Sequence, residues 1–321
     1  MGALYGGVDL GGTAIKAALC SKDGGVVVES HAPTEPERGP EAVVETMAAL
    51  VCEAADGLGE LHGVGVGCPG LVDRAAGVTR FLPNLPGHWR DVPVGGMLSE
   101  RLGVPVFLLN DARLATLGEL HFGWGRGRER ATFLLLTLGT GVGGGVVIDG
   151  RIRLGPLGAA GELGHLSVDP LGARCTCGAR GCLETVASGS AMVAEALRWM
   201  RAGQASGLEA AVAGELARLT PELIGSFARD GDPAALAVVR HAGEAIGLAA
   251  SSLVLALHPD AIVLGGGVSA IGEPLLDSIR AELAARVSMF PIDDVAVVVS
   301  ELGALGGALG GAALARCAGE L

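Results

Sequence analysis

The chain has 321 residues and half of them are apolar, so it is globular and long enough for one large core or, as we expect, two lobes. Its net charge of −12 argues against non-specific nucleic-acid binding, which needs Lys and Arg to neutralise phosphates. The sequence begins directly with strand-like residues and shows no secretory signal, and its seven cysteines are an odd number. We therefore expect a reduced, cytoplasmic protein with no disulfide framework and no membrane span.

The first third of the chain alternates strand and helix patterns. Helical spacing of apolar residues is seen at 41–55 and 112–122. Short apolar runs predict strands at 4–10, 14–20, 26–29, 64–67 and 104–109.

The pattern then restarts. Residues 131–148 carry no charge, but their glycines make a poor membrane span, and we predict a strand at 132–138, a turn at 139–145 and a strand at 146–148. Further on we predict helices across 190–257 and at 280–287, strands at 261–264 and 295–299, and a final helix of small residues. Strand, glycine turn and strand thus occur twice, which predicts two similar α/β domains facing each other across a cleft.

Three glycine turns are candidate phosphate sites. Asp9 ends a strand before Gly11-Gly12-Thr13, where backbone N–H groups can approach phosphate oxygens and the carboxylate can hold Mg²⁺; a plain tight hairpin is the alternative. The glycine-dense run at 138–145 is the stronger signal, because such density weakens a hairpin unless a ligand approaches. A third turn at 264–269 follows a strand and precedes an expected helix, whose N-terminus suits a nucleotide. None of the three has the spacing of a P-loop or a dinucleotide fingerprint.

Asn110 and Asp111 follow an apolar strand, and polar residues at strand ends in α/β sheets commonly face a ligand. Asp111 is a candidate general base for a substrate hydroxyl, and Asn110 can both donate to and accept from a sugar hydroxyl pair. The alternative is that Asp111 only caps a helix that begins at Ala112.

His165, Cys175, Cys177 and Cys182 form a compact set with the ligand count of a closed structural zinc site; chance proximity is the alternative. Four protein ligands leave no open position for catalysis, so we expect the metal to support a polar pocket that contains Glu162 and Glu184. One ring nitrogen of His165 can bind zinc while the other faces a substrate hydroxyl.

In this order the motifs resemble the ROK family of sugar kinases and sugar-responsive repressors. The resemblance spans nearly the whole chain, and the pair GELGH and CxCGxxGCxE is its most specific part. The motifs are DLGGT at 9–13, GCPG at 67–70, PNLPG at 83–87, ND at 110–111, LGTGVGGG at 138–145, GELGH at 161–165, CTCGARGCLE at 175–184 and LGGGVS at 264–269.

The resemblance implies an α/β fold of two lobes, the actin-like (ribonuclease-H-like) ATPase fold with a zinc-binding loop. It implies a smaller lobe at 1–112, completed by the C-terminal helix at about 302–321, and a larger lobe at 113–301 with the zinc loop at 165–182. It also implies ATP-dependent phosphorylation of a hexose with Mg²⁺, structural Zn²⁺ and Asp111 as the base. Family habit suggests a homodimer or homotetramer.

The resemblance also assigns site residues. Sugar contacts would come from Gly70, Asn84, Asn110, Asp111, Glu162, His165 and Glu184. ATP contacts would come from Asp9, Gly11, Gly12, Thr13, Lys16, Gly139, Thr140, Gly141, Gly143, Gly265, Gly266 and Gly267. Zinc would be held by His165, Cys175, Cys177 and Cys182.

Several alternatives remain at this stage. Glucose is the expected substrate, but fructose, mannose, N-acetylglucosamine and N-acetylmannosamine differ from it in few groups, and polyphosphate is a less favoured donor than ATP. A sugar-sensing regulator would need an N-terminal DNA-binding segment, for which the eight residues before Asp9 leave no room. A non-catalytic sugar-binding module is the third possibility. Arg113 and His88 depart from the family's usual residues, so they are positions where the pocket can differ.

Overall fold

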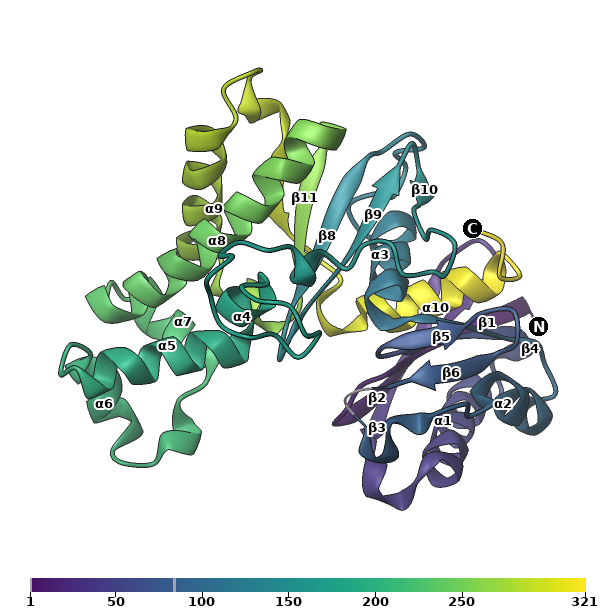
Figure 1. Cartoon of the computed structure of the whole chain (residues 1–321). Coiled ribbons are helices and arrows are strands. Elements are labelled where there is room, and N and C mark those ends of the chain that lie inside the picture. Colours follow the sequence, from purple (N-terminus) through teal and green to yellow (C-terminus); the bar gives the residue numbers. More distant parts are fainter. Residues whose placement is uncertain (1, 83–84) are drawn as a thin grey trace. The chain divides into compact units, whose positions relative to one another are not determined.

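A computed structural model describes residues 2–82 and 85–321 (Figure 1). The predicted sugar contact Asn84 therefore lies outside the described residues. The chain forms two compact units. Unit 1 comprises Met1–Arg130, Gly145–Gly161 and Ala304–Leu321, and unit 2 comprises Ala131–Gly144 and Glu162–Gly303.

The sheet of unit 1 has five strands in the order β3-β2-β1-β4-β7. β1 pairs antiparallel with β2 and parallel with β4, and β4 pairs parallel with β7. The carboxyl ends of β1, β4 and β7 therefore meet at one edge of the sheet. The strands are β1 (Gly2–Leu10), β2 (Ala14–Ser21), β3 (Val26–Pro33), β4 (Gly59–Cys68) and β7 (Val106–Asn110).

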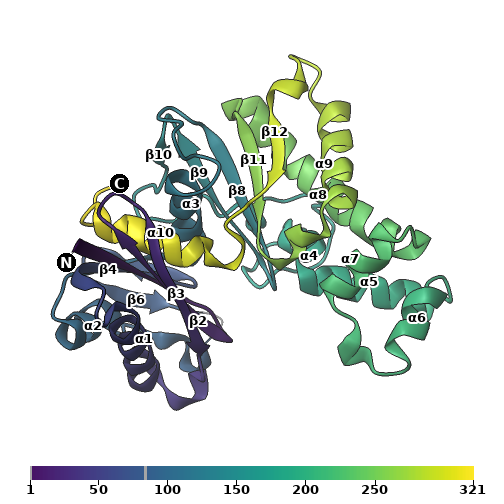
Figure 2. The same ribbon diagram turned by 180° about the vertical axis from the view of Figure 1, so that it is seen from behind.

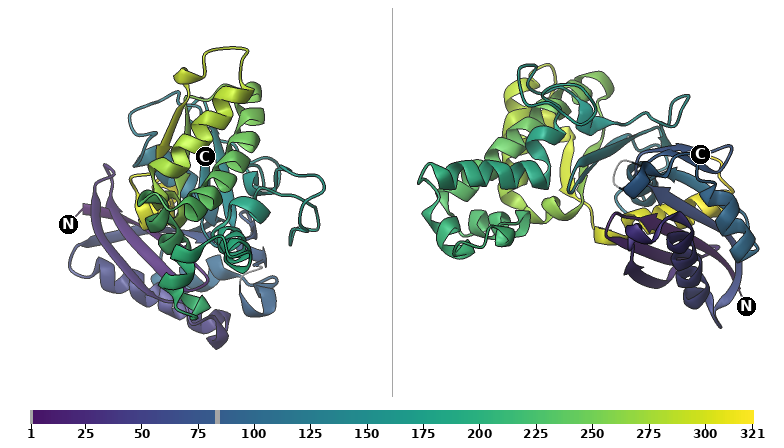
Figure 3. Two further views of the ribbon diagram at one scale, coloured as in Figure 1. Left: turned by 90° about the vertical axis from the view of Figure 1, so that its left-hand side faces the viewer. Right: turned by 60° about the horizontal axis from the view of Figure 1, so that its bottom comes forward.

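Helices pack against this sheet and against one another. α10 (Gly306–Arg316) lies against β1, β4 and α3 (Asp111–His121), and the right-hand view of Figure 3 shows it beside the N-terminal strands. The approach is so close that a Cβ at Gly65 would lie 2.2 Å from the carbonyl oxygen of Gly311. Unit 1 also contains α1 (Pro40–Ala55), α2 (Val94–Leu102) and a hairpin of β5 (Leu71–Asp73) and β6 (Val78–Phe81).

The second five-stranded sheet has the order β10-β9-β8-β11-β12. Figure 2 shows β11 between β8 and β12, and both pairings are parallel. Every residue of β11 is buried, as expected for a central parallel strand. The strands are β8 (Phe133–Leu138), β9 (Val142–Ile148), β10 (Arg151–Ile152), β11 (Ala261–Gly265) and β12 (Ala296–Val299).

Apart from its strands, unit 2 is mainly helical. Within the described residues, α8 (Pro233–Leu257) is the one helix long and apolar enough to span a membrane, but 61% of its apolar window is buried, and it packs against α7 and α9 as a core helix does. The other helices are α4 (Glu184–Ala187), α5 (Gly189–Arg201), α6 (Ser206–Val212), α7 (Pro221–Arg229) and α9 (Glu273–Arg286). Short 3-10 turns occur at η1 (Pro36–Arg38), η2 (Pro86–Trp89), η3 (Leu163–His165), η4 (Leu216–Arg218), η5 (Gly267–Ile271), η6 (Ile292–Asp294) and η7 (Gly303–Leu305).

The α/β class and most predicted elements are confirmed, with two corrections. β9 begins at Val142, so Gly143–Gly145 lie in the strand and not in the turn; a Cβ at Gly144 would lie 2.8 Å from the Leu163 side chain, which explains the glycine there. The turn predicted at 264–269 runs first into the 3-10 turn η5, and α9 begins only at Glu273, so the N-terminus of the expected helix does not lie directly at the glycines. The hairpin β5–β6, α2 and β10 were not predicted.

Candidate functional site

The first candidate region lies at the carboxyl edge of the unit 1 sheet. Asp9 comes near the end of β1, next to Gly67 of β4 in the parallel register and opposite Lys16 of β2. After β1 the chain turns through Gly11 to Thr13. Thr34 braces this turn, because its hydroxyl donates to the Gly11 carbonyl at 2.7 Å and its backbone N–H donates to the Thr13 carbonyl at 2.9 Å. The predicted Gly12 and Thr13 are exposed, so their backbone groups can meet a ligand.

The electrostatics of this edge centre on Asp9. Burial raises the pKa of Asp9, and the Lys16 ammonium partly opposes that rise. Burial also raises the pKa of Cys68 at the end of β4, and the charges of Asp111 and Asp9 raise it further. The negative charges of Asp9 and Asp111 therefore both act on the buried thiol of Cys68. A Cβ at Gly67 would lie 3.5 Å from Asp9 Oδ1 and 3.4 Å from the Asp111 Cα, so the fold brings Asp9 and Asp111 together.

Asn110 and Asp111 lie at the start of α3. α3 begins at Asp111, and its N-cap is Asn110, whose Oδ1 accepts from the N–H groups of Ala112 and Arg113 at 3.0 and 3.3 Å. The N-cap of α3 is therefore Asn110 and not Asp111, although Asp111 also accepts from one N–H of the first turn. Asp111 is only partly buried, and its Oδ1 accepts from the Ala112 N–H at 2.8 Å.

Two neighbours of this region were singled out in the sequence. Gly70 takes a left-handed φ of 91°, and its carbonyl accepts from Asn110 Nδ2 at 3.0 Å. His88, in η2, has a left-handed φ of 55° and is exposed, and its ring packs on Phe81 with centroids 5.1 Å apart. His88, which departs from the residue usual in the family, therefore makes an aromatic contact with Phe81 at the surface.

The second candidate region is the cysteine cluster of unit 2. The ligand atoms of His165, Cys175, Cys177 and Cys182 all lie within 4.8 Å of one another. The Cys177 and Cys182 sulfurs are 3.6 Å apart, and Cys175 Sγ is 3.6 Å from His165 Nδ1. Zn–S bonds of about 2.3 Å in a tetrahedron place two sulfurs about 3.8 Å apart, so the donor set and its spacing fit zinc. The predicted metal cluster is consistent with this geometry.

Two carboxylates adjoin the cluster. His165 turns Nδ1 toward the sulfurs and Nε2 toward Glu162, whose Oε2 is 4.0 Å away. Glu184, the first residue of α4, lies with Oε1 3.7 Å from Cys175 Sγ, while its Oε2 accepts from the Val142 N–H at 3.0 Å. A Cβ at Gly141 would lie 2.4 Å from Glu184 Oε2, so a larger residue there would displace this carboxylate. Glu184 therefore joins the cysteine cluster to the glycine turn, a link that the sequence did not reveal.

The turn between β8 and β9 is further held by the start of α5. The Gly189 N–H donates to the Gly139 carbonyl at 2.8 Å, and the Ser190 hydroxyl donates to the Thr140 carbonyl at 2.9 Å. Ser188 caps α5 by accepting from the Ala191 N–H at 3.2 Å. The predicted Gly139 to Gly143 segment thus lies beside a helix N-terminus, which favours anions. Sequence reasoning missed Ser188 and Ser190, although a Ser-Gly-Ser before a helical pattern is a capping signal.

The third glycine turn lies beside the start of α7. Gly266 has a φ of 82°, and Gly266 and Gly267 are exposed, whereas Gly265 is buried in β11. A Cβ at Gly267 would lie 3.6 Å from Glu222 Oε1, and one at Gly189 would meet Pro221, the Gly139 carbonyl and Val268. The second and third glycine turns therefore converge within unit 2, together with the starts of α5 and α7.

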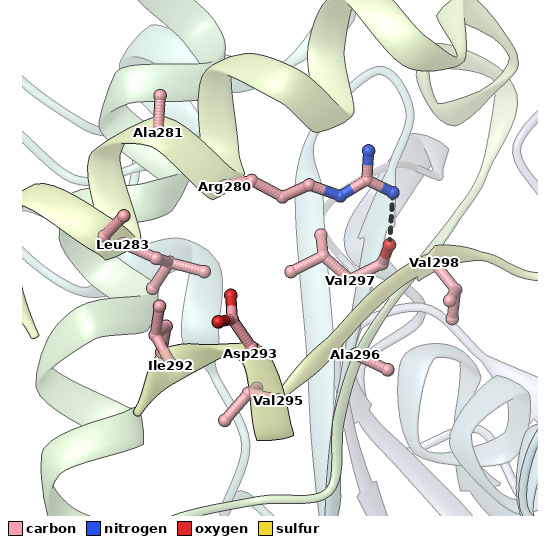
Figure 4. A pocket seen from close by; sticks show the side chains of 10 residues that line it. Arg280, Ala281, Leu283, Ile292, Asp293, Val295, Ala296, Val297 and Val298 are labelled. Carbon is pink, nitrogen blue, oxygen red and sulfur yellow. Dashed lines mark hydrogen bonds between the residues drawn. The ribbon is translucent and has the colours of Figure 1, made fainter. Parts of the chain in front are cut away.

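Unit 2 also contains a cavity of about 620 Å³ between α9 and β12, and none of the predicted site residues lines it. Figure 4 shows Arg280 on its border, donating to the Val297 carbonyl at 3.0 Å. Arg280 also pairs with Glu273 and Asp277, so its charge is already balanced.

Comparison with known proteins places these regions in a family. The ROK family model matches residues 5–318. The chain is 38% identical to the glucokinase of Thermotoga maritima, over 97% of this chain and 96% of that one. A crystal structure of a ROK family glucokinase from Streptomyces griseus, in complex with glucose and AMPPNP, superposes with a TM-score of 0.84 at 35% identity and covers 98% of this chain and 99% of that one. A xylose repressor of Caldicellulosiruptor bescii is 27% identical, over 92% of this chain but only 74% of its own length.

The chain belongs to the ROK family, and its two mixed sheets with their helices are the actin-like fold of ROK kinases. Within the family it is a glucokinase-like kinase, since the match to glucokinases runs over nearly the full length of both partners.

Proposed function

We propose that the protein transfers the γ-phosphoryl group of ATP to the 6-hydroxyl of glucose, with Asp111 as the general base. The observation that carries this proposal is the meeting of Asp9 and Asp111 beside Gly67 at the carboxyl edge of β1, β4 and β7. In that arrangement one carboxylate can take a proton from a sugar hydroxyl while the other serves a phosphate-bound cation. The substrates are those that the Streptomyces griseus structure holds, as glucose and an ATP analogue.

On the sugar side, Asp111 accepts the proton of the attacking hydroxyl, which makes the oxygen a better nucleophile toward phosphorus. Asp111 is held at the first position of α3 and is partly exposed, so its carboxylate is fixed in direction and accessible. We propose that the sugar hydroxyls are bound by Gly70, Asn84, Asn110, Glu162, His165 and Glu184.

On the phosphate side, backbone N–H groups take the main part. The exposed turn residues Gly12 and Thr13, and the turn residues Thr140 and Gly141 beside the start of α5, can each donate a backbone N–H to phosphate oxygens, whereas the Gly139 N–H already donates to the Gly141 carbonyl. Mg²⁺, when bound with ATP, would neutralise phosphate charge next to Asp9. Gly265, Gly266 and Gly267, with Lys16 near Asp9, complete the proposed ATP contacts.

The test is a panel of initial rates of ADP release with Mg-ATP and glucose, fructose, mannose, N-acetylglucosamine or N-acetylmannosamine. We expect glucose to give the highest kcat/KM, and release without sugar to be negligible. If an N-acetylhexosamine gives the highest kcat/KM, that sugar and not glucose is the substrate, and the proposed mechanism is unchanged. Turnover with polyphosphate in place of ATP would replace the donor.

A second candidate is a non-catalytic sugar-sensing protein, favoured only by the likeness to the xylose repressor. It would bind glucose without releasing ADP. Calorimetric glucose binding together with an absent ADP signal over the whole panel would select it.

A further inference from the structure

Arg113 is a buried cation in an unusual place. It is 1% exposed and stands at the third position of α3, where the positive end of the helix dipole disfavours a cation. A buried charge costs free energy unless hydrogen bonds compensate it. A guanidinium held there is therefore stabilised by specific acceptors around it.

Three of those acceptors lie in two of the described segments. Arg113 Nη1 donates to Asn110 Oδ1 at 3.1 Å. Arg113 Nε donates to the Ala160 carbonyl at 2.9 Å, and Nη2 donates to the Ala159 carbonyl at 2.9 Å. The rigid fork of the guanidinium suits this geometry, and a lysine ammonium could not reach all three acceptors.

The first consequence concerns the Asn110 amide. Its Oδ1 accepts from the Ala112 N–H, the Arg113 N–H and the Arg113 guanidinium, so the oxygen faces the helix and is saturated. Its Nδ2 donates to the Gly70 carbonyl at 3.0 Å, which uses one of the two amide hydrogens. Among the described residues the second hydrogen has no acceptor, so Asn110 can offer a sugar a donor but no acceptor. From the sequence we expect Asn110 both to donate to and to accept from sugar hydroxyls, but these bonds leave it only the donor role.

The second consequence concerns residues 155–160. The outer side of this segment borders a cavity of about 410 Å³ that is shared with the β5–β6 hairpin, and Leu157 is 74% exposed. Inside the segment, the Ala160 N–H donates to the Leu154 carbonyl at 2.9 Å. Arg113 adds two bonds, at Ala159 and Ala160, which come three and two residues before Glu162 in the sequence.

We propose that Arg113 is a positioning residue for sugar recognition: it orients the Asn110 amide as a donor and fixes the segment that leads into Glu162. This rests on the proposed sugar-kinase function. Arg113 itself need not touch the sugar, because its effect passes through Asn110 and the Ala159–Ala160 carbonyls.

The test compares Arg113→Met, Arg113→Lys and the matched control Arg280→Met. Arg280 also donates to a backbone carbonyl, but its cavity holds no proposed site residue. We expect Arg113→Met to raise the glucose KM at least tenfold and to leave the ATP KM within about twofold, Arg113→Lys to give an intermediate glucose KM, and Arg280→Met to change neither. Equal increases of both KM values, or no increase, would overturn the proposal.

A double-mutant cycle with Asn110→Ala separates positioning from simple loss of stability. If Arg113 acts through Asn110, the two changes in glucose affinity are less than additive, because the second substitution removes an orientation already lost. Fully additive changes at matched thermal stability would contradict the mechanism. If Arg113→Met does not fold, Arg113→Lys alone decides, and a wild-type glucose KM in that variant overturns the proposal.

Failure of the kinase proposal has a different signature. The wild-type protein would then release no ADP with any hexose. Calorimetric glucose binding by wild type and Arg113→Lys would still report on Arg113: weaker binding by the variant supports the positioning role, and equal binding overturns it.

Discussion

Unit 1 and unit 2 place their candidate site residues by different means. In unit 1, Asp9 and Asp111 are set by regular structure, one in a strand and the other at the start of a helix directly after a strand. In unit 2, the chain between Glu162 and Glu184 forms no strand or α-helix; it contains one three-residue 3-10 turn and two isolated β-bridges. Backbone bonds such as those from the Val168 and Leu183 N–H groups to the Gly181 and Leu166 carbonyls hold this segment irregularly, and side-chain contacts among His165, three cysteines and Glu184 add to them.

The difference suggests a supporting role for a metal at the cysteine cluster. A parallel sheet edge fixes side-chain positions through its backbone ladder, and it needs no ligand to do so. An irregular segment lacks the repeated backbone ladder of a sheet, and a closed zinc site formed by its His and Cys side chains would add a strong local constraint. We therefore expect unit 1 residues to affect chemistry with little effect on folding, and unit 2 residues to affect order and binding together.

The largest expected effect is at the carboxyl edge of the unit 1 sheet, at Asp111. Asp111→Asn removes the base but keeps an acceptor for the Ala112 N–H, and the cap on α3 comes from Asn110. We predict that kcat falls by about 10²–10⁴-fold while the melting temperature stays close to wild type. Steady-state ADP release and thermal denaturation check this. Near-wild-type turnover would remove Asp111 from the base role.

The second largest effect is expected in the unit 2 segment that contains the cysteine cluster. Cys177→Ser removes one of four ligands, and we predict loss of bound zinc and a glucose affinity at least about tenfold weaker, because Glu162 and Glu184 lose their fixed surroundings. Metal analysis and calorimetry measure the two quantities. Cys52→Ser is the matched control, since Cys52 is an exposed cysteine outside the cluster. Zinc-free protein with full glucose affinity would contradict the supporting role.

How much of this could be predicted from sequence differs between the two regions. Strand ends carry polar residues next to apolar runs, so Asp9 and Asp111 stood out by pattern, and the cysteines stood out by spacing. Glycine density at 138–145 also located the right segment, but the strand start at Val142 was missed, because packing against Leu163 explains Gly144 and the pattern does not show such packing.

Contacts between distant residues could not be predicted. The bond from the Val142 N–H to Glu184 joins residues 42 positions apart, and those from Arg113 reach 46 and 47 positions. Neither has a local sequence signal. Arg113 stood out only as a departure from a family pattern, and its burial among backbone carbonyls became clear only in the fold.

A smaller effect sharpens the link between the metal cluster and the glycine turn. Glu184→Ala leaves the buried Val142 N–H without its acceptor, whereas Glu184→Gln can keep that bond with its amide oxygen. We predict that both variants raise the glucose KM by about tenfold, since both lose the charged acceptor, but that only Ala also raises the ATP KM several-fold. Kinetics with each substrate varied in turn measure the split. An ATP KM unchanged in Glu184→Ala would mean that the turn does not depend on this carboxylate.

The smallest expected effect concerns protein stability, which the buried carboxylate of Asp9 lowers. Because burial raises the pKa of Asp9 above its ordinary value of 3.8, the folded protein binds this proton more tightly than the unfolded chain does. The ionised carboxylate therefore destabilises the fold, and stability declines as the pH rises from about 3.8 through the raised pKa. Asp9→Asn carries no such charge. In buffer without Mg²⁺ or nucleotide we predict that Asp9→Asn has a melting temperature higher than wild type by about 2–4 °C at pH 7, with the difference shrinking toward pH 4.

Mg-ATP should raise the melting temperature of wild type more than that of Asp9→Asn, because a cation beside residue 9 compensates the charge only in the protein that carries it. A variant less stable than wild type at pH 7 would show that Lys16 more than offsets the burial cost.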